Sequence, residues 1–410
     1  VHLGIRLEPS AIAEAVPELR RAYFDAGAAA ADEIALQAAG RLAYVHAELL
    51  AQPDDAEAWL EHASMMLRRR GAEDPSVEAL LLSTEAHVAH LRADYDTAHD
   101  RFARALELLE RELPAVHPDI ALMLNGIATN EYRRGNQDEA QRLFARALDL
   151  SEQTLGPEHP DVAHALNNLA NVHAGRREHD TAIPLYERAI DIRTRAVGPR
   201  DPMLAAALTN LASMYDEAGQ PARAEPLYRR ALAIKEATLG ADNAKLLVTL
   251  EGLCAVARQL GALDGSLWWC ARAVALAERA HGTDHPRFAS TLRFLAAAQT
   301  AQGEHAIALQ TGARAVAIAE QALGADHPDL VVFLAKLAAL HANVGELDRA
   351  LEIDQRGLAI LLDTLGPDHP RIAEKLDEVS ESQSALGQHE EAASTAQRAA
   401  ELRRRLEASP

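Results

Sequence analysis

The side chains best suited to chemistry in this chain are carboxamides gathered between residues 118 and 217. They are Asn125, Asn167, Asn168, Asn171 and Asn210. A carboxamide both donates and accepts hydrogen bonds, so a row of them matches the alternating N–H and C=O groups of an extended peptide. Because Asn is a mediocre helix former, a cluster of it in helical sequence predicts peptide binding. The alternatives are that these amides are solvated, or that they bridge neighbouring helices.

Other kinds of chemistry are not indicated. The histidines that precede proline recur every 42 residues or a multiple of it. They therefore lie at least one repeat apart in space, too far to share one metal ion at a ligand distance of about 2 Å. The tripeptide His-Pro-Asp at 117–119, 159–161 and 327–329 resembles the signature of J-domain co-chaperones, but its repetition favours a structural role. No serine or threonine has a neighbouring base that the sequence identifies. We therefore predict no catalytic residue, no metal and no cofactor.

The elements that position these amides repeat with a period of 42 residues. Proline stands at 118, 160, 202, 286, 328 and 370, and Ala244 fills the vacant node. A period between about 20 and 50 residues indicates stacked supersecondary units. Such a solenoid presents a long surface to a partner.

Each unit predicts two helices, which we call helix A and helix B. Pro160 suits the first position of helix A, where a missing N–H costs nothing. The residue before it reads as a capping position; this column holds His117, His159, Asp201, Asn243, His285, His327 and His369. Helix A ends near a glycine in six units and at Arg177 in the other, and helix B stops at a second glycine such as Gly156.

This unit resembles the tetratricopeptide repeat (TPR), with the pair Leu169–Ala170 in helix A and Ala182 and Tyr186 in helix B. Its length and the strings LGPEHPDVAHALNNLA (155–170) and YERAIDIR (186–193) resemble the repeats of kinesin light chain. The resemblance implies an all-α fold, a right-handed superhelical TPR solenoid of antiparallel helix pairs. We expect irregular helices over 1–75, including helices over 9–26, 30–49 and 53–70, and a degenerate repeat over 76–117. Seven units then follow over 118–405, starting at 118, 160, 202, 244, 286, 328 and 370.

The chain also resembles the C-terminal TPR region of bacterial serine/threonine protein kinases of the myxobacterial type. In those proteins similar repeats follow a kinase domain. The 410 residues contain no kinase motif. The resemblance therefore implies that the chain is a fragment, with a kinase domain upstream of Val1.

Charge and cysteine content restrict the partners. The formal net charge is −20, from 41 basic and 61 acidic residues. This balance argues against nucleic acid. It favours basic or neutral partners, and the alternative is that the charge only keeps a long surface soluble. No apolar run is long enough to predict a membrane span. Cys254 and Cys270 are too few for a disulfide framework and occupy core positions, which predicts a reducing, cytoplasmic setting.

In TPR proteins helix A lines the concave groove, and kinesin light chain holds a peptide backbone with helix A asparagines. The resemblance implies that the five asparagines bind a peptide whose sequence is read by nearby side chains such as His164 and Asp216. Beyond Asn210 the equivalent positions lose this character; they are Glu251, Gly252, Arg293, Phe294, Ala335 and Lys336. The predicted site is therefore confined to the first half of the array.

The predicted function is a non-catalytic module that binds a protein or peptide, as the recruiting region of a larger bacterial signalling protein. One alternative is a sensor region that regulates its own upstream catalytic domain. Another is a self-assembling scaffold. Trp268 and Trp269 interrupt the pattern of helix B, and they predict either core packing between repeats or an exposed aromatic anchor.

Overall fold

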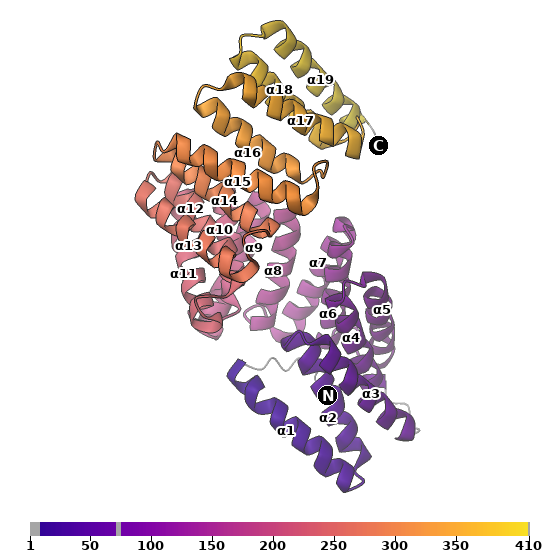
Figure 1. The fold of residues 1–410 in the computed structure, drawn as a ribbon. Helices are drawn as coiled ribbons and strands as arrows, with labels where there is room; N and C mark the ends of the chain where they lie inside the picture. Colours follow the sequence, from indigo (N-terminus) through magenta and orange to yellow (C-terminus); the bar gives the residue numbers. More distant parts are fainter. Residues whose placement is uncertain (1–8, 71–74, 409–410) are drawn as a thin grey trace. The chain divides into compact units, whose positions relative to one another are not determined.

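The computed structural model describes residues 9–70 and 75–408, and this part of the chain is an all-α solenoid without strands (Figure 1). Consecutive helices pack as antiparallel pairs. The helices are α1 (Pro9–Ala28), α2 (Asp32–Tyr44), the π-helix η1 (Val45–Leu49), α3 (Pro53–Arg70), α4 (Pro75–Leu91), α5 (Tyr95–Glu112), α6 (Pro118–Arg133), α7 (Gln137–Leu155), α8 (Pro160–Gly175), α9 (His179–Ala196), α10 (Leu204–Glu217), α11 (Pro221–Leu239), the 3₁₀ helix η2 (Ala244–Leu246), α12 (Leu247–Gln259), α13 (Leu263–His281), α14 (Pro286–Ala301), α15 (His305–Leu323), α16 (Leu330–Asn343), α17 (Leu347–Leu365), α18 (Pro370–Ala385) and α19 (His389–Ala408).

The chain divides into two compact units, Val1–Asp201 and Pro202–Pro410. The first unit contains α1 to α9, and the second contains α10 to α19. The helices predicted over 9–26, 30–49 and 53–70 are confirmed as α1, α2 with η1, and α3.

The histidine before the proline is the N-cap of helix A in four of the seven units, at α6, α8, α14 and α18, as predicted. The imidazole Nδ1 of His159 accepts a hydrogen bond from the backbone N–H of Asp161 at 3.2 Å. His117, His285, His327 and His369 repeat this contact with the residue two positions later, and Asn243 does so through Oδ1. At the remaining node the carboxylate of Asp201 accepts a hydrogen bond from Nε of Arg193 at 2.5 Å, and α10 starts only at Leu204.

Glycine at the end of each helix has a backbone reason. Gly156 ends α7 with φ of +87°, a left-handed conformation that glycine adopts without steric cost. Arg177, which follows α8 where Gly135 follows α6, also has a positive φ, of +58°. The arginine that interrupts the glycine column therefore keeps the turn and bears the strain of its Cβ.

The core is built where small residues face large ones. Ala170 and Tyr186 are buried in the first unit, with exposed fractions of 0% and 1%. Glycine stands where a ring comes closest to the backbone of helix A. A Cβ at Gly126 would lie 2.6 Å from the ring of Phe102, and a Cβ at Gly252 would lie 2.4 Å from the ring of Tyr228. These helices therefore pack at a distance that only small residues allow.

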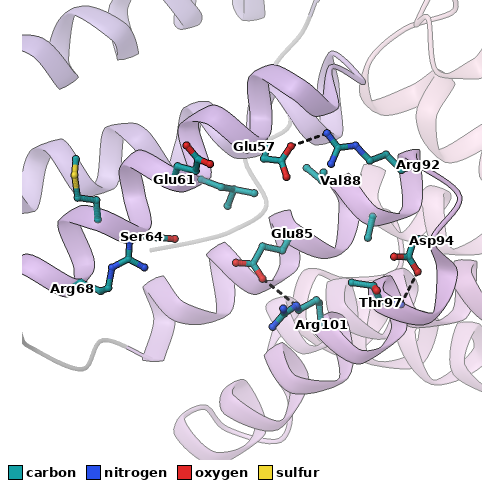
Figure 2. A pocket seen from close by; sticks show the side chains of 13 residues that line it. Glu57, Glu61, Ser64, Arg68, Glu85, Val88, Arg92, Asp94, Thr97 and Arg101 are labelled. Atoms are coloured by element: carbon teal, nitrogen blue, oxygen red, sulfur yellow. Dashed lines mark hydrogen bonds and ion pairs between the residues drawn. The ribbon is translucent and has the colours of Figure 1, made fainter.

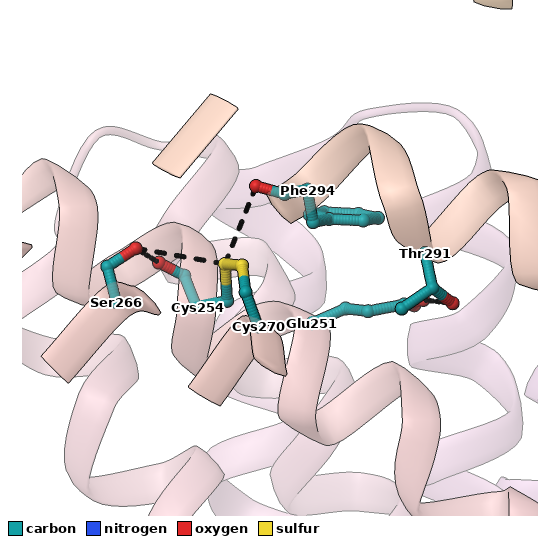
Figure 3. Close-up of a disulfide and its surroundings, with 6 residues drawn as sticks. All are labelled: Glu251, Cys254, Ser266, Cys270, Thr291 and Phe294. Carbon is teal, nitrogen blue, oxygen red and sulfur yellow. Dashed lines mark hydrogen bonds between the residues drawn. A yellow bond between two sulfur atoms is a disulfide. The ribbon is translucent and has the colours of Figure 1, made fainter. Parts of the chain in front are cut away.

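Cys254 on α12 and Cys270 on α13 form a disulfide (Figure 3), so the prediction that both thiols are reduced is wrong. Cys254 stands in the small-residue column of helix A, and Cys270 stands in the aromatic column of helix B. These columns face each other within a helix pair, which places the two Cα atoms 5.2 Å apart, a separation that suits a disulfide. Both cysteines are buried, and Phe294 of the next helix A lies beside them.

Candidate peptide-binding site

A pocket of about 270 Å³ opens in the first unit on the helix A side chains of three consecutive pairs, α4, α6 and α8. We call it the amide pocket. Its lining residues are Ala47, Ala51, His87, His90, Leu91, Phe102, Leu122, Asn125, Gly126, Thr129, His164 and Asn168. Three of the seven residues predicted to bind a peptide, Asn125, His164 and Asn168, therefore lie around one cavity.

Apolar side chains give the pocket a rigid wall. Phe102 of α5 is 2% exposed and packs over Gly126 of α6. The ring of His87 meets Phe102 edge to face, with centroids 4.9 Å apart. Leu91 and Leu122 complete the apolar lining. Because glycine at 126 leaves room for the ring, α5 contributes an aromatic surface to a site that is otherwise built on helix A.

One end of the pocket is formed by the segment between α2 and α3. Ala47 belongs to the π-helix η1, and Ala51 adopts a left-handed conformation with φ of +51°. The backbone N–H of Gln52 donates to the carbonyl of His46 at 2.8 Å, and the two side chains also form a hydrogen bond of 2.8 Å. Short π-helical segments and non-glycine residues with positive φ are often found at functional sites.

The amide groups of the pocket are incompletely paired within the part of the chain that the structure describes. Nδ2 of Asn125 donates to the carbonyl of Ala121 at 3.0 Å, but its Oδ1 is buried without a partner. Asn168 is partly buried, and neither end of its carboxamide forms a hydrogen bond with the described residues. Buried polar groups are almost always hydrogen-bonded in native proteins. An unfilled acceptor at the edge of a cavity therefore indicates a missing partner.

His90 is a further polar residue of the amide pocket. Its Nδ1 lies 2.6 Å from Oδ1 of Asn130, a buried residue of α6. Since the amide oxygen accepts, Nδ1 carries a proton. Nε2 is then the acceptor of the neutral imidazole.

Two of the asparagines predicted to bind a peptide, Asn167 and Asn171, belong to the first unit but do not line the amide pocket. Asn171 accepts a hydrogen bond from the hydroxyl of Tyr186 at 2.6 Å, which joins α8 to α9. Asn167 is partly buried, and its Oδ1 has no partner among the described residues. The contact of Asn171 supports the alternative that some of these amides bridge helices.

Asn210 and Asp216 belong to the second unit, whereas the other five residues predicted to bind a peptide belong to the first. Asn210 is partly buried on α10. Asp216 accepts a hydrogen bond from Nε2 of Gln259 at 2.6 Å, and burial raises the pKa of its carboxyl above the usual value.

In the second unit the column equivalent to Asn125 and Asn167 joins helices. Thr209 of α10 and Thr249 of α12 both accept hydrogen bonds from Nζ of Lys235, at 3.1 and 2.7 Å. One repeat later Glu251 accepts from Arg287 at 2.6 Å and from Thr291 at 2.7 Å. These contacts explain why the carboxamide pattern ends there, because the same position now carries hydroxyl and charged groups that pair across helices.

A larger hollow of about 720 Å³ lies between α3, α4 and α5 (Figure 2). Several charged side chains at this hollow form ion pairs: Arg92 contacts Asp54 and Glu57 at 2.9 and 2.8 Å, and Arg101 contacts Glu85 at 3.2 Å. Burial raises the pKa of the Glu85 carboxyl, although Arg101 opposes the shift. None of the residues predicted to bind a peptide lines this hollow.

The tryptophan pair divides between the two predicted roles. Trp269 is 9% exposed and packs in the core, whereas Trp268 is 56% exposed. Their rings meet edge to face at 4.3 Å. Core packing is thus confirmed for Trp269, and Trp268 presents its ring at the surface of α13.

Metal-ligating groups do not gather in the described residues, where no set of three or more His, Cys, Asp or Glu side chains could hold an ion. His281 and His285 are separated by three residues, a spacing that is compatible with metal binding and that the sequence analysis does not include. Their rings stack with centroids 4.8 Å apart, and Nδ1 of His285 already accepts a hydrogen bond from the backbone N–H of Arg287.

Among the described helices, none combines the length and apolar character needed to cross a membrane.

A protein-family comparison identifies the repeats. The model described as "Tetratricopeptide repeat" matches residues 119–195, 161–237, 245–321 and 329–405, which together make up more than half of the chain. The search of curated proteins finds no match.

Solved structures with similar folds include bacterial and eukaryotic repeat proteins. The apo quorum sensor NprR from B. thuringiensis is 15% identical with a TM-score of 0.65, covering 89% of this chain and 98% of that one. A Rap protein complexed with Competence and Sporulation Factor is 15% identical with a TM-score of 0.56, covering 90% and 98%. A kinesin light chain protein of TPR-like repeats from Podospora anserina is 22% identical with a TM-score of 0.45, covering 50% and 98%.

Proposed function

Because the chain belongs to the tetratricopeptide repeat family, we propose that it is a non-catalytic interaction module that binds a segment of a partner protein on its helix A face. The observation that carries the proposal is the amide pocket. It gathers Asn125, His164 and Asn168 from two consecutive repeats around one cavity. The aromatic and aliphatic wall would cover side chains of the segment, and the amides would bond its polar groups.

The fold is compatible with this use. The similar Rap protein is complexed with Competence and Sporulation Factor, and we propose a bound partner for this chain as well. The net charge of −20 would favour the approach of basic segments through long-range attraction. Asn167, Asn210 and Asp216 remain proposed contacts outside the amide pocket, whereas the hydrogen bond from Tyr186 favours a role for Asn171 in joining helices.

We also propose a cellular setting, which rests on the sequence resemblance. The chain would be the recruiting region of a bacterial signalling protein in the cytoplasm, with a serine/threonine kinase domain upstream of Val1. The disulfide between Cys254 and Cys270 is the observation against the cytoplasm, because disulfides are rare in reducing compartments.

The test is capture of peptides from a displayed random library by the immobilised chain. Wild type is compared with the double variant Asn125→Ala/Asn168→Ala, and circular dichroism verifies that both are equally helical. Gln153→Ala is the matched control, because it removes an exposed carboxamide of α7 outside the pocket. Losing one hydrogen bond to a buried peptide group costs about 1–1.5 kcal/mol, so the double variant should bind at least tenfold more weakly.

Two outcomes would contradict the proposal. Equal capture by the wild type and the double variant would move the site away from the amide pocket. Failure of the wild type to capture any peptide would remove the binding function itself.

A further inference from the structure

We propose that the amide pocket seats one primary carboxamide of the partner segment, the side chain of Gln or Asn, and discriminates against charged side chains. This inference rests on the proposed function and specifies which chemistry the site recognises. It follows from the hydrogen-bonding groups that the pocket leaves unfilled and from the charges that it lacks.

Asn125 sets the first requirement. Its Nδ2 is already committed to the carbonyl of Ala121, and its buried Oδ1 has no donor among the described residues. An unpaired buried acceptor costs about 1–3 kcal/mol. Because Oδ1 is closed to solvent in this structure, the Asn125 side chain must turn toward the cavity before a ligand N–H can bond to Oδ1 and recover this cost, whereas a carboxylate has no proton to give.

His90 and Asn168 set the second requirement. His90 donates from Nδ1 to Asn130, so its Nε2 is an acceptor when the ring carries a single proton. Asn168 has both a donor and an acceptor that are unused within the described part of the chain. Together Asn125, His90 and Asn168 therefore offer more acceptors than donors but include at least one of each. A primary carboxamide has two N–H donors and one carbonyl oxygen, whereas a hydroxyl has a single donor.

The absence of charged side chains from the lining sets the third requirement. Asp, Glu, Lys and Arg make up 25% of the chain, yet none of the twelve residues that line the amide pocket is one of them. An ammonium or guanidinium group could donate to Oδ1 of Asn125, but it would be desolvated without a countercharge. That cost exceeds the gain of a hydrogen bond. The acidic surface elsewhere can thus attract basic flanking residues while the pocket itself holds a neutral group.

The pocket is large enough to accommodate one side chain of the partner segment. Its volume of about 270 Å³ lies just below the range of about 300–1,000 Å³ that is typical of small-molecule sites. Ala47 and Ala51 form one end of the cavity. We therefore expect an anchor position in the bound segment, flanked by residues that lie outside the pocket.

The first experiment uses peptides captured by the full chain. The Gln or Asn shared by the captured peptides is replaced in turn by Glu, Lys and Leu, and Kd is measured by fluorescence anisotropy. We expect the Glu and Lys peptides to bind at least tenfold more weakly. With Asn125→Ala, the preference for Gln over Leu should shrink by about tenfold, and Asn168→Ala should act in the same direction. Equal binding of the Gln, Glu and Lys peptides, or an unchanged preference in both variants, would overturn the proposal.

A second experiment does not depend on a protein partner. Ligand-observed NMR compares N-acetylglutamine methylamide with the corresponding glutamate and lysine compounds as probes of the full chain. Saturation transfer confined to the glutamine compound, and lost in Asn125→Ala, is the expected result. If no peptide is captured but the glutamine probe still binds, the proposed function fails while the carboxamide specificity stands. Equal transfer to all three probes would refute the specificity even if peptides are captured.

Discussion

The hydroxyl of Tyr186 donates a hydrogen bond of 2.6 Å to Oδ1 of Asn171, which links helix B to helix A within one repeat. Tyr186 is 1% exposed, and its ring fills the aromatic column between α8 and α9. Asn171 is also a residue that the sequence predicts to hold a peptide. Its carboxamide oxygen already accepts a hydrogen bond from a buried tyrosine of the same repeat.

Replacing Asn171 should therefore affect stability rather than binding. Asn171→Ala leaves a buried phenol without its acceptor, which should lower the free energy of unfolding by about 1–3 kcal/mol. The double variant Asn171→Ala/Tyr186→Phe removes both partners and should recover part of this loss. Urea unfolding followed by circular dichroism measures the stability, and peptide anisotropy measures the binding. A tenfold loss of peptide affinity in Asn171→Ala would return this residue to the binding site.

The capping histidines predict a distinction between two substitutions. His159 caps α8 through Nδ1, and aspartate is an equally good N-cap. His159→Asp should change the free energy of unfolding by no more than about 0.5 kcal/mol, whereas His159→Ala should lower it by about 1 kcal/mol. Chemical denaturation of the three proteins side by side provides the comparison. Equal destabilisation by Asp and Ala would show that the side chain acts in some other way.

The disulfide predicts a redox-dependent stability of the second unit. Cys254 and Cys270 are separated by 16 residues, and closing a loop of this length stabilises a protein by about 3 kcal/mol through the unfolded chain. Dithiothreitol should therefore lower the melting temperature of the wild type. The variant Cys254→Ala/Cys270→Ala is the control and should be insensitive to the reductant. An identical melting temperature of the wild type with and without reductant would contradict the prediction.

Lys235 predicts a pH-dependent contribution. Burial lowers the pKa of its ammonium group, and within the described residues its partners are the hydroxyls of Thr209 and Thr249. A lowered pKa means that the folded state binds this proton less tightly than the unfolded state. Stability therefore rises as the pH increases through the folded pKa toward the ordinary lysine value, and it falls again as the pH decreases.

Lys235→Met should raise the melting temperature at neutral pH, because it removes a desolvated charge and keeps the apolar stem. It should also abolish the gain in stability on the alkaline side. Lys336→Met is the matched control at an exposed lysine and should change neither quantity. Thermal unfolding at several pH values between neutral and alkaline tests both statements. A lower melting temperature of Lys235→Met at neutral pH would show that the ammonium contacts outweigh the cost of burial.

The sequence by itself determined the helices, their pairing and their caps. These features depend on contacts between residues close in the chain, and the column of His159 shows why. Its hydrogen bond reaches only two residues along the backbone, so the identity of the residue and its place before Pro160 suffice to predict it. The Leu–Ala and Ala–Tyr columns are predictable for the same reason, because every repeat packs the same positions against its neighbours.

Tertiary structure alone decided which polar residues share a site. Asn125 and Asn168 line one pocket, Asn171 is bound by Tyr186, and Asn210 lies in the other unit. The amide pocket also needs Phe102 from helix B and Ala51 from the segment before α3, which belong to no repeated binding pattern. The disulfide also depends on tertiary structure, because Cys254 and Cys270 can pair only when their two columns face each other. In the structure their Cα atoms are 5.2 Å apart. Repetition along the chain specifies how each helix folds, whereas the choice of hydrogen-bond partner depends on which side chains meet in space and remain unpaired.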